Sequence, residues 1–362
     1  MRKTLITLAI LGATAGFAHA QTDVNIYGIV DGGYVWQTGR DLGMAANNES
    51  RIGFRGSENL GSDVKVTFEL ERRFAINTGE ATARYNSSDF LSTVPVRDQA
   101  ARDWQGAANM GLSSHTWGTV RLGRVNNPSI ESYRRIDPFN NYSVGASLTA
   151  EGNAFYSEQL ANTLRYDSPG WSGFSFGLSL TLGQDDHDNV FYQRFGNHGW
   201  NMLVQYDRGP LLLLGNFHRP ADSDNSTVWN LGAAYQFGNV RVSLGYQDTR
   251  VKNAIARWIT ADTGFGGRFR NRDARQREAI AGLQWDIGPG QLNASFNHAI
   301  LAHKYSLGYT YNLSRRTALY GVVAYLDAKD SAAGWLYSGG LDNRGAERDS
   351  ITSVQIGMTH RF

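Results

Sequence analysis

Residues 174–182 have the sequence Phe-Ser-Phe-Gly-Leu-Ser-Leu-Thr-Leu, in which large apolar side chains alternate strictly with small or polar ones. Successive side chains of a β-strand point to opposite faces, so this stretch predicts a strand with one apolar and one polar face. The same alternation recurs at residues 227–237, 240–246 and 304–313. Apart from one candidate short helix after Asn127, no stretch has a convincing helical period. The sequence therefore predicts an all-β fold.

Turns of two sizes separate the alternating stretches. Short turns such as Gly238-Asn239 and Gly288-Pro289-Gly290 alternate with much longer polar connections. Counting outward from them predicts about 16 strands, at residues 23–37, 48–58, 63–74, 104–114, 118–126, 159–168, 173–183, 199–208, 210–218, 227–237, 240–250, 277–287, 291–299, 304–313, 316–328 and 349–362. An even-stranded antiparallel meander with short turns at one rim and long loops at the other is typical of a transmembrane β-barrel.

The composition excludes several other classes. Among 362 residues 41 are Gly and 12% are aromatic, but only 19% are charged. After residue 20 no apolar run approaches the roughly 20 residues of a membrane-spanning helix. The lack of Cys excludes disulfides and thiolate metal sites, and a net charge of +2 does not favour nucleic acid as a partner.

The N-terminus predicts export. Arg2 and Lys3 are followed by an apolar stretch over residues 4–17 and by the cleavage sequence Ala18-His19-Ala20. These are the three parts of a secretory signal peptide. We expect residues 1–20 to be removed and residues 21–362 to form one domain.

A soluble β-sandwich or propeller could also accommodate such a meander. The barrel is favoured because the polar faces are rich in Ser, Gly, Asn, Gln and Arg, which suit a water-filled wall. Aromatic residues such as Trp36, Trp171 and Trp285 lie near strand ends, where the girdles of a membrane barrel lie. The chain also ends on a strand, with Phe362 in phase with the apolar face.

Several stretches resemble the Gram-negative general porins, especially the betaproteobacterial branch. They are residues 24–31, 50–61, 68–71, 118–124, 164–169, 309–317 and 359–362. The resemblance implies a 16-stranded homotrimeric barrel in the outer membrane, with a third long loop, here within 126–158, folded inward to constrict the pore. It implies that the barrel-assembly machinery recognises Phe362 and that loop 75–103 contacts a neighbouring protomer. The function implied is passive diffusion of ions and small hydrophilic solutes, not catalysis.

Strand phase assigns the charged side chains of the lumen. Ile52 and Phe54 face lipid, which places Arg51 and Arg55 inside, because a charge facing lipid is costly. The same argument places Lys65, Glu69, Glu71, Arg73, Arg121, Arg165 and Arg241 in the lumen. About seven inward basic residues face about five acidic ones (Asp31, Glu69, Glu71, Glu278 and Asp286), which suggests a weak preference for anions.

By the resemblance, Arg51 belongs to the basic side of the constriction. Gly106 and Gln159 stand where the family often has two further arginines, and Arg134 and Arg135 on the inward loop are candidates to replace them. The loop also carries the acids Glu131, Asp137, Glu151 and Glu158. Acids facing a basic wall would set a transverse field, whereas pairing of Arg51 with Glu69 or Glu71 would brace the wall. The two interpretations are compatible.

The remaining candidates lie in long loops or at the rim. Asp185, Asp186 and Asp188 could hold Ca²⁺ against lipopolysaccharide phosphates, although a solvated loop is the alternative. The basic run over residues 268–277 is expected to attract solutes or lipopolysaccharide. His298 and His303 have no partner at metal-ligand spacing, and no cofactor is predicted. A substrate-selective porin and a non-channel barrel, such as an adhesin, remain as functional alternatives.

Overall fold

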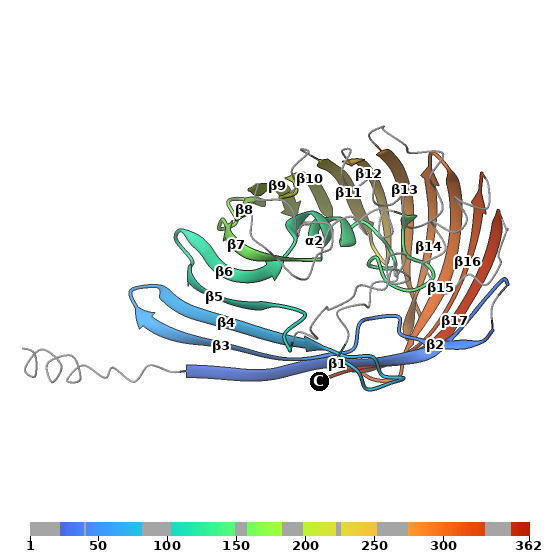
Figure 1. Ribbon diagram of the computed structural model, residues 1–362, viewed down its shortest axis with the longest axis horizontal. Helices are drawn as coiled ribbons and strands as arrows, with labels where there is room; N and C mark the ends of the chain where they lie inside the picture. Colours follow the sequence, from blue (N-terminus) through green and yellow to red (C-terminus); the bar gives the residue numbers. More distant parts are fainter. Residues whose placement is uncertain are drawn as a thin grey trace, which may run out of the picture.

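One closed antiparallel β-sheet forms the wall of the protein in the computed structural model (Figure 1). The structure describes residues 22–39, 41–81, 103–148, 158–182, 198–221, 226–251, 274–329 and 349–362. Each long strand pairs with its neighbour in sequence, and β1 also pairs with β17. The predicted meander is therefore confirmed, and its first and last strands meet.

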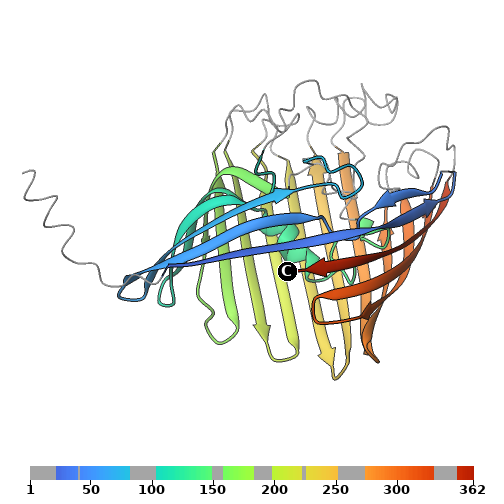
Figure 2. The same cartoon turned by 90° about the horizontal axis from the view of Figure 1, so that it is seen from below.

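The wall strands follow the alternation of the sequence closely. They are β1 (Thr22–Gln37), β2 (Gly43–Ala45), β3 (Arg51–Gly61), β4 (Val64–Arg73), β5 (Ala108–Ser114), β6 (Gly118–Asn126), β7 (Gln159–Asp167), β8 (Phe174–Thr181), β9 (Gly199–Arg208), β10 (Leu211–Arg219), β11 (Thr227–Phe237), β12 (Val240–Val251), β13 (Ala274–Ile287), β14 (Gly290–Ala299), β15 (Ala302–Asn312), β16 (Thr317–Ala328) and β17 (Ser350–Arg361). The three-residue β2 pairs with β1 beyond the end of β3, which leaves 16 long wall strands. Figure 2 shows most of the described short turns gathered at one end of the wall, and the turn between β14 and β15, at residues 300–301, lies at the other end.

The predicted strand 48–58 begins later than expected, at Arg51, because the chain before it turns into the lumen. The buried Asp31 carboxylate accepts hydrogen bonds from the backbone N–H of Asn47 (2.6 Å) and from Nδ2 of Asn48 (3.2 Å). Ser50 Oγ also donates to the carbonyl oxygen of Asp31 at 3.0 Å. These bonds hold residues 46–50 against β1 and place Glu49 inside the barrel.

The last residue completes the seam of the barrel. The N–H of Gly28 donates to the carbonyl of Phe362, and the N–H of Phe362 donates to the carbonyl of Gly28, each at 3.1 Å. A Cβ at Gly28 would lie 2.4 Å from the Phe362 ring, so only glycine leaves room for it. Phe362 thus packs over β1 on the outer face.

The two faces of the wall differ in the way the alternation predicts. On β11, Trp229, Leu231 and Tyr235 are exposed outward, while Asn230 and Ala234 are buried on the inner side. Large exposed apolar side chains recur around the whole described wall. An apolar exterior around a polar interior excludes a soluble sandwich or propeller, which would bury its apolar face.

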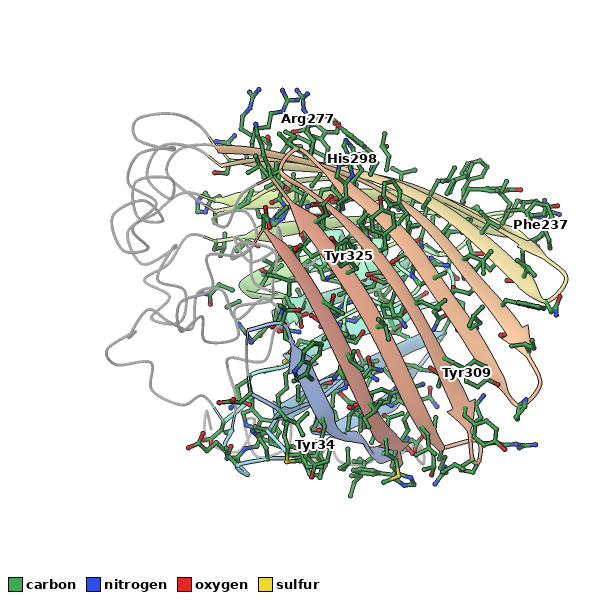
Figure 3. The ribbon with its side chains drawn as sticks, turned by 90° about the vertical axis from the view of Figure 1, so that its right-hand side faces the viewer. Tyr34, Phe237, Arg277, His298, Tyr309 and Tyr325 are labelled. Atoms are coloured by element: carbon green, nitrogen blue, oxygen red, sulfur yellow. The ribbon has the colours of Figure 1, made fainter. Side chains whose placement is uncertain are left out.

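Aromatic side chains mark both ends of the wall. Near the strand ends opposite the short turns, the Phe217 ring lies 4.7 Å from Trp200 and 4.5 Å from Trp229 (centroid distances). Figure 3 shows Phe237 and Tyr309 at the short-turn end, and Arg277 and His298 at the other. Two such bands match the aromatic girdles expected at the two membrane interfaces.

The candidate short helix after Asn127 is confirmed as α2 (Pro128–Arg134), which lies inside the barrel (Figure 1). The Asn127 side chain caps it by accepting a hydrogen bond from the N–H of Ser129 at 3.1 Å, and Pro128 occupies a first-turn position that needs no donor. None of the helices within the described ranges is long and apolar enough to cross a membrane.

Candidate functional site

Residues 127–148, here called the inner segment, lie along the lumen face of the wall from β9 to β17. Asn230 Nδ2 on β11 donates to the carbonyl and hydroxyl oxygens of Ser129 at 3.0 and 2.7 Å. Ser243 Oγ on β12 donates to the carbonyl of Ile136 at 2.6 Å, and Gln355 Oε1 on β17 accepts from the N–H of Val144 at 3.1 Å. Neutral polar side chains therefore fix much of the segment to the wall, and Arg241 on β12 adds a charged donor to the carbonyl of Arg135 at 2.9 Å. We call β9–β17 the covered half of the wall.

Inward-facing glycines let the inner segment approach the covered half. A Cβ at Gly282 would lie 2.5 Å from Pro138 Cγ, and one at Gly232 would lie 2.5 Å from Ile136 Cγ1. Any larger residue at these two positions would meet the segment. Beyond them, Leu148 is completely buried in a cluster with Ala299, Ala302, Leu326, Ala328 and Ile351.

Asp137, predicted to line the pore as a loop acid, instead holds the inner segment together. Its carboxylate accepts hydrogen bonds from the N–H groups of Phe139 (2.9 Å), Asn141 (3.0 Å) and Ser147 (2.8 Å). Burial raises its pKa, although these hydrogen bonds oppose the shift. The short spacing between Asp137 and the N–H groups that follow it explains why the side chain turns into the loop.

Six charged residues meet between the inner segment and the opposite side of the lumen. We call them the ion network: Glu49, Arg51, Glu71, Arg73, Arg134 and Glu158. At its centre the Arg73 guanidinium pairs with Glu158 at 2.8 Å, with Glu71 at 3.1 Å and with Glu49. Arg134 of α2 pairs with Glu158, and Arg51 Nε lies 3.5 Å from Glu71.

Because the ion network is buried, its charged side chains are stable only when they are paired. The side chains of Arg73 and Glu49 are only 8% and 4% exposed. Removing one partner of a buried ion pair leaves an uncompensated charge, which costs far more than an exposed pair contributes. Because the network joins α2 to β3, β4 and the start of β7, it ties the inner segment to the wall that the segment does not cover. We call β1 and β3–β8 the bare half.

Two carboxylates of the ion network, Glu49 and Glu158, differ in the direction of their pKa shifts. Burial raises the pKa of Glu49 to about 8, although Arg73 opposes the shift. Burial also disfavours ionisation of Glu158, but Arg134 and Arg73 outweigh it and lower its pKa. Arg134 lies 4.4 Å over the Tyr142 ring, which keeps the guanidinium close to Glu158. Glu49 is thus the carboxylate of the two that can change charge near neutral pH.

A second group of charges joins α2 to β6 and β7. Arg165 pairs with Glu131 of α2 at 2.7 Å and with Asp167 at 2.9 Å, and Arg121 pairs with Asp167 at 2.5 Å. Arg135 lies apart from both groups, because it pairs with Asp207 on β9 and donates to Gln205 Oε1 at 3.0 Å. Of the two loop arginines predicted to replace the missing ones, only Arg134 belongs to the ion network that contains Arg51 and Arg73.

The departures from the family pattern fit this arrangement. A Cβ at Gly106 would lie 2.2 Å from Glu71 Oε1, so the missing arginine leaves room for Glu71 to reach Arg73. Gln159 is buried beside Asn126, and the preceding Glu158 enters the ion network. Glu69, also predicted in the lumen, accepts a hydrogen bond from the Tyr27 hydroxyl at 2.8 Å. Sequence reasoning did not single out Glu49.

Two cavities open into the lumen towards the short turns. One of about 350 Å³ lies on the bare half and is lined by charged residues that include Arg55, Glu69 and Arg121. The other, about 290 Å³, lies beneath the inner segment and is lined by amides, by Tyr320 and, near the turns, by Arg315. Water-filled space thus continues past the inner segment.

Some predicted residues lie outside the described part of the chain. They are the calcium candidates Asp185, Asp186 and Asp188, the loop acid Glu151, and the arginines at 268, 270 and 272. The predicted signal peptide over residues 1–20 and loop 75–103 beyond residue 81 also lie outside it.

An antiparallel barrel with an apolar exterior, aromatic girdles and a charged, water-accessible lumen defines an outer-membrane channel. The sequence matches the family model described as "Gram-negative porin" over residues 7–331, and the chain belongs to this family. The resemblance to betaproteobacterial porins is confirmed. The protein is an outer-membrane, multi-pass β-barrel that serves as a passive diffusion channel.

Named relatives agree with this assignment. The chain is 29% identical to outer membrane porin protein 32 of Delftia acidovorans and 27% identical to an outer membrane porin protein of Bordetella pertussis, over the full length of each protein. Its fold matches that of the anion-selective porin from Comamonas acidovorans with a TM-score of 0.73 and 24% identity, covering 94% of this chain and 100% of that one.

Proposed function

We propose that the protein is a non-enzymatic, homotrimeric channel for ions and small hydrophilic solutes, with a weak preference for anions set where the ion network meets the inner segment. The observation that carries this proposal is the ion network itself, which fixes charges between α2 and the bare half. A fixed, narrow and charged passage is what a diffusion channel needs to discriminate among solutes.

The sign of the preference follows from which charges face water. Most lumen acids at the level of the inner segment are paired or buried, including Glu49, Glu71 and Glu158. Among the described residues that line the two lumen cavities, four basic side chains form no salt bridge, against three such acids. The basic ones are Arg55, Arg315, Arg316 and Arg361, and the acids are Asp23, Glu69 and Asp286. The Comamonas porin is described as anion-selective, which supports the same sign.

A planar bilayer experiment tests this proposal. In a KCl gradient, the reversal potential of the purified protein should show Cl⁻ permeating more easily than K⁺. Conductance should be ohmic and should appear in groups of three equal steps, as a trimer requires. A K⁺ preference would reject the proposed selectivity, and single steps would reject the trimer.

A substrate-selective porin is the second candidate. The chain is 32% identical, over 73% of its length, to a protein named chitoporin from Vibrio furnissii, and it covers 71% of that protein. The cavity lined by Asn140, Gln291, Asn293 and Tyr320 offers amide and aromatic groups suited to a neutral polar solute. Block of conductance by one neutral oligosaccharide at low concentration would favour this function over general diffusion.

Processing and lipid contact belong to the same proposal. Cleavage after Ala20 would leave Gln21 at the N-terminus, which the mass of the purified protein tests. Phe362 serves as the assembly signal, so its deletion should reduce the amount of assembled barrel. The outward-facing Arg250, Arg275 and Arg277 contact lipopolysaccharide phosphates, and binding of purified lipopolysaccharide should weaken when all three are replaced by Gln. The acidic stretch over residues 185–188, which lies outside the described part of the chain, is proposed to hold Ca²⁺ against lipopolysaccharide phosphates.

A further inference from the structure

The hairpin of β14 and β15 carries two histidines on the outer face of the wall. His298 and His303 occupy directly opposite positions of the two strands, next to the short turn at residues 300–301 and at the rim opposite the other short turns. The other outward side chains of β14 and β15 are apolar or aromatic: Leu292, Ala294, Phe296, Tyr305, Leu307, Tyr309 and Tyr311. The sequence shows neither histidine a partner at metal-ligand spacing, but strand register places the two side by side.

The spacing of the two imidazoles is that of two ligands of one metal ion. Their Nδ1 atoms lie 3.2 Å apart, and the ring centroids lie 4.7 Å apart. Zinc–nitrogen bonds are about 2.0–2.1 Å long, so two of them at a tetrahedral angle place their nitrogens about 3.3 Å apart. Only a small rotation of the rings is needed to direct both lone pairs at a shared ion. The pair is thus close to the geometry of a bidentate site.

The surroundings hold the pair in place and leave it open. The Phe296 ring stacks on His303 with an interplanar angle of 13° and a centroid distance of 6.1 Å. His298 is exposed and His303 is half-buried, and Figure 3 shows His298 at the outer end of the wall near Arg277. The Arg277 charge is partly offset by Asp248, which lies 3.5 Å away. A hydrated ion can therefore reach the pair from outside the barrel.

We propose that Nδ1 of His298 and Nδ1 of His303 bind a divalent first-row transition metal ion such as Zn²⁺, Cu²⁺ or Ni²⁺. Imidazole nitrogen suits these ions, and the affinity should be highest for Cu²⁺. Among the described residues no group of three or more His, Asp or Glu side chains has metal-binding spacing, so water completes the coordination. Asp327 faces outward directly across from His303 on β16, where it can accept a hydrogen bond from a metal-bound water.

In the metal-free protein the same contact is a hydrogen bond between the two rings, one donating and one accepting. The ion replaces the shared proton and links the two strands at the rim. This site is separate from the lumen, so occupancy should leave the conductance of the channel unchanged. Failure of the metal proposal and failure of the channel proposal are therefore distinguishable.

Metal titration of the full-length protein, purified without a histidine tag, tests the site. Calorimetry with Zn²⁺ should show one ion per chain, and pulsed EPR with Cu²⁺ should report two imidazole nitrogens. His298→Gln and His303→Gln should each abolish this binding, while the matched exposed controls His115→Gln and His360→Gln retain it. Unchanged conductance would show that every variant is folded. Zn²⁺ binding that persists in folded His298→Gln, or a Cu²⁺ spectrum with fewer than two imidazoles, would overturn the proposal.

Discussion

The covered half and the bare half of the lumen wall have the same backbone architecture but different inward side chains. On the covered half these are mostly neutral and small, as in Asn201, Asn216, Asn230, Ser243, Asn293, Ser295, Asn297, Ser306, Ser353 and Gln355, all of which are buried. On the bare half they are largely charged, as in Arg51, Arg55, Lys65, Glu69, Glu71, Arg73, Arg121, Arg165 and Asp167.

The difference teaches what decides where a chain segment can dock inside a porin. Amide and hydroxyl side chains can leave water and bind the backbone of the inner segment at little cost in free energy, because each hydrogen bond to water is replaced. Glycines leave the space that the segment needs. Charged groups lose more free energy when they leave water, so most of them stay exposed or pair with one another, as Arg73 does with Glu71 and Glu158. The solute path therefore runs along the bare half.

We expect the largest effect on stability from removing Arg73, the centre of the ion network on the bare half. Arg73→Met would leave Glu71 and Glu158 without their shared cation, and we expect a loss of about 3–5 kcal/mol in the free energy of unfolding. Urea unfolding of the purified protein measures it. Arg55→Met is the matched control, because Arg55 lies 5.1 Å over the Tyr27 ring with no salt bridge. Equal unfolding midpoints for the two variants would contradict the role of the network.

On the covered half, the corresponding change is Gly282→Leu. A Cβ there would already lie 2.4 Å from Ser243 Oγ and 2.5 Å from Pro138 Cγ, so the inner segment must leave the wall. We expect a cost of about 1–3 kcal/mol and a lower single-channel conductance, since the segment moves into the lumen. Gly215→Leu is the control, because Gly215 faces outward and a Cβ there would lie 3.6 Å from Leu231, at ordinary contact distance. A Gly282→Leu channel with native conductance would show that the segment is not docked there.

Ion selectivity offers a milder comparison of the two halves. Glu158→Gln removes one negative charge next to Arg73 and Arg134, and we expect the Cl⁻/K⁺ permeability ratio to rise about threefold, because that charge attracts K⁺ and repels Cl⁻ across a lumen where salt screens it. Glu278→Gln removes a buried acid from the covered half and should leave the ratio unchanged. Reversal potentials measure both. If Glu278→Gln changed the permeability ratio more than Glu158→Gln, the ion path would run along the covered half.

The smallest expected effect is the pH dependence of selectivity. Because burial raises the pKa of Glu49 to about 8, this carboxyl is mostly protonated at neutral pH and gains its charge as the pH rises through that value. We expect anion preference to fall by about twofold between pH 7 and 9, since the added charge is negative. The free energy of unfolding should fall as pH rises from the ordinary carboxyl pKa towards 8, because the folded state retains the proton longer than the unfolded state. Glu49→Gln should remove both dependences, and a variant that keeps them would refute this assignment.

Much of the wall could be predicted from the sequence, because alternation sets the strands and their phase independently of distant contacts. Arg51, Glu71 and Arg73 were placed in the lumen on that basis. The turn of Glu49 into the barrel could not be predicted, since it depends on hydrogen bonds from residues 47 and 48 to Asp31. Neither could the pairing of His298 with His303, which requires the register of two strands.

The docking side of the inner segment left a signal that sequence reasoning did not use. Gly232, Gly245, Gly282 and Gly308 lie at inward positions of four strands, and each would place a Cβ within 3.0 Å of the segment. Inward glycines among neutral polar residues mark a surface that another part of the chain covers. Asp137 misled the prediction in the other direction. An acid in a loop is expected to face water, but here the loop's own N–H groups bind the carboxylate.

Cysteine modification tests most directly whether solutes pass along the bare half, and the chain contains no native Cys. Single cysteines would replace Asn109 and Ser113 on the bare half, and Asn230 and Ser243 beneath the inner segment. A charged thiol reagent added to the bilayer chamber should change the conductance of the Asn109→Cys and Ser113→Cys channels and leave the Asn230→Cys and Ser243→Cys channels unchanged. Rapid modification at the two covered positions, with none at the bare ones, would contradict this account.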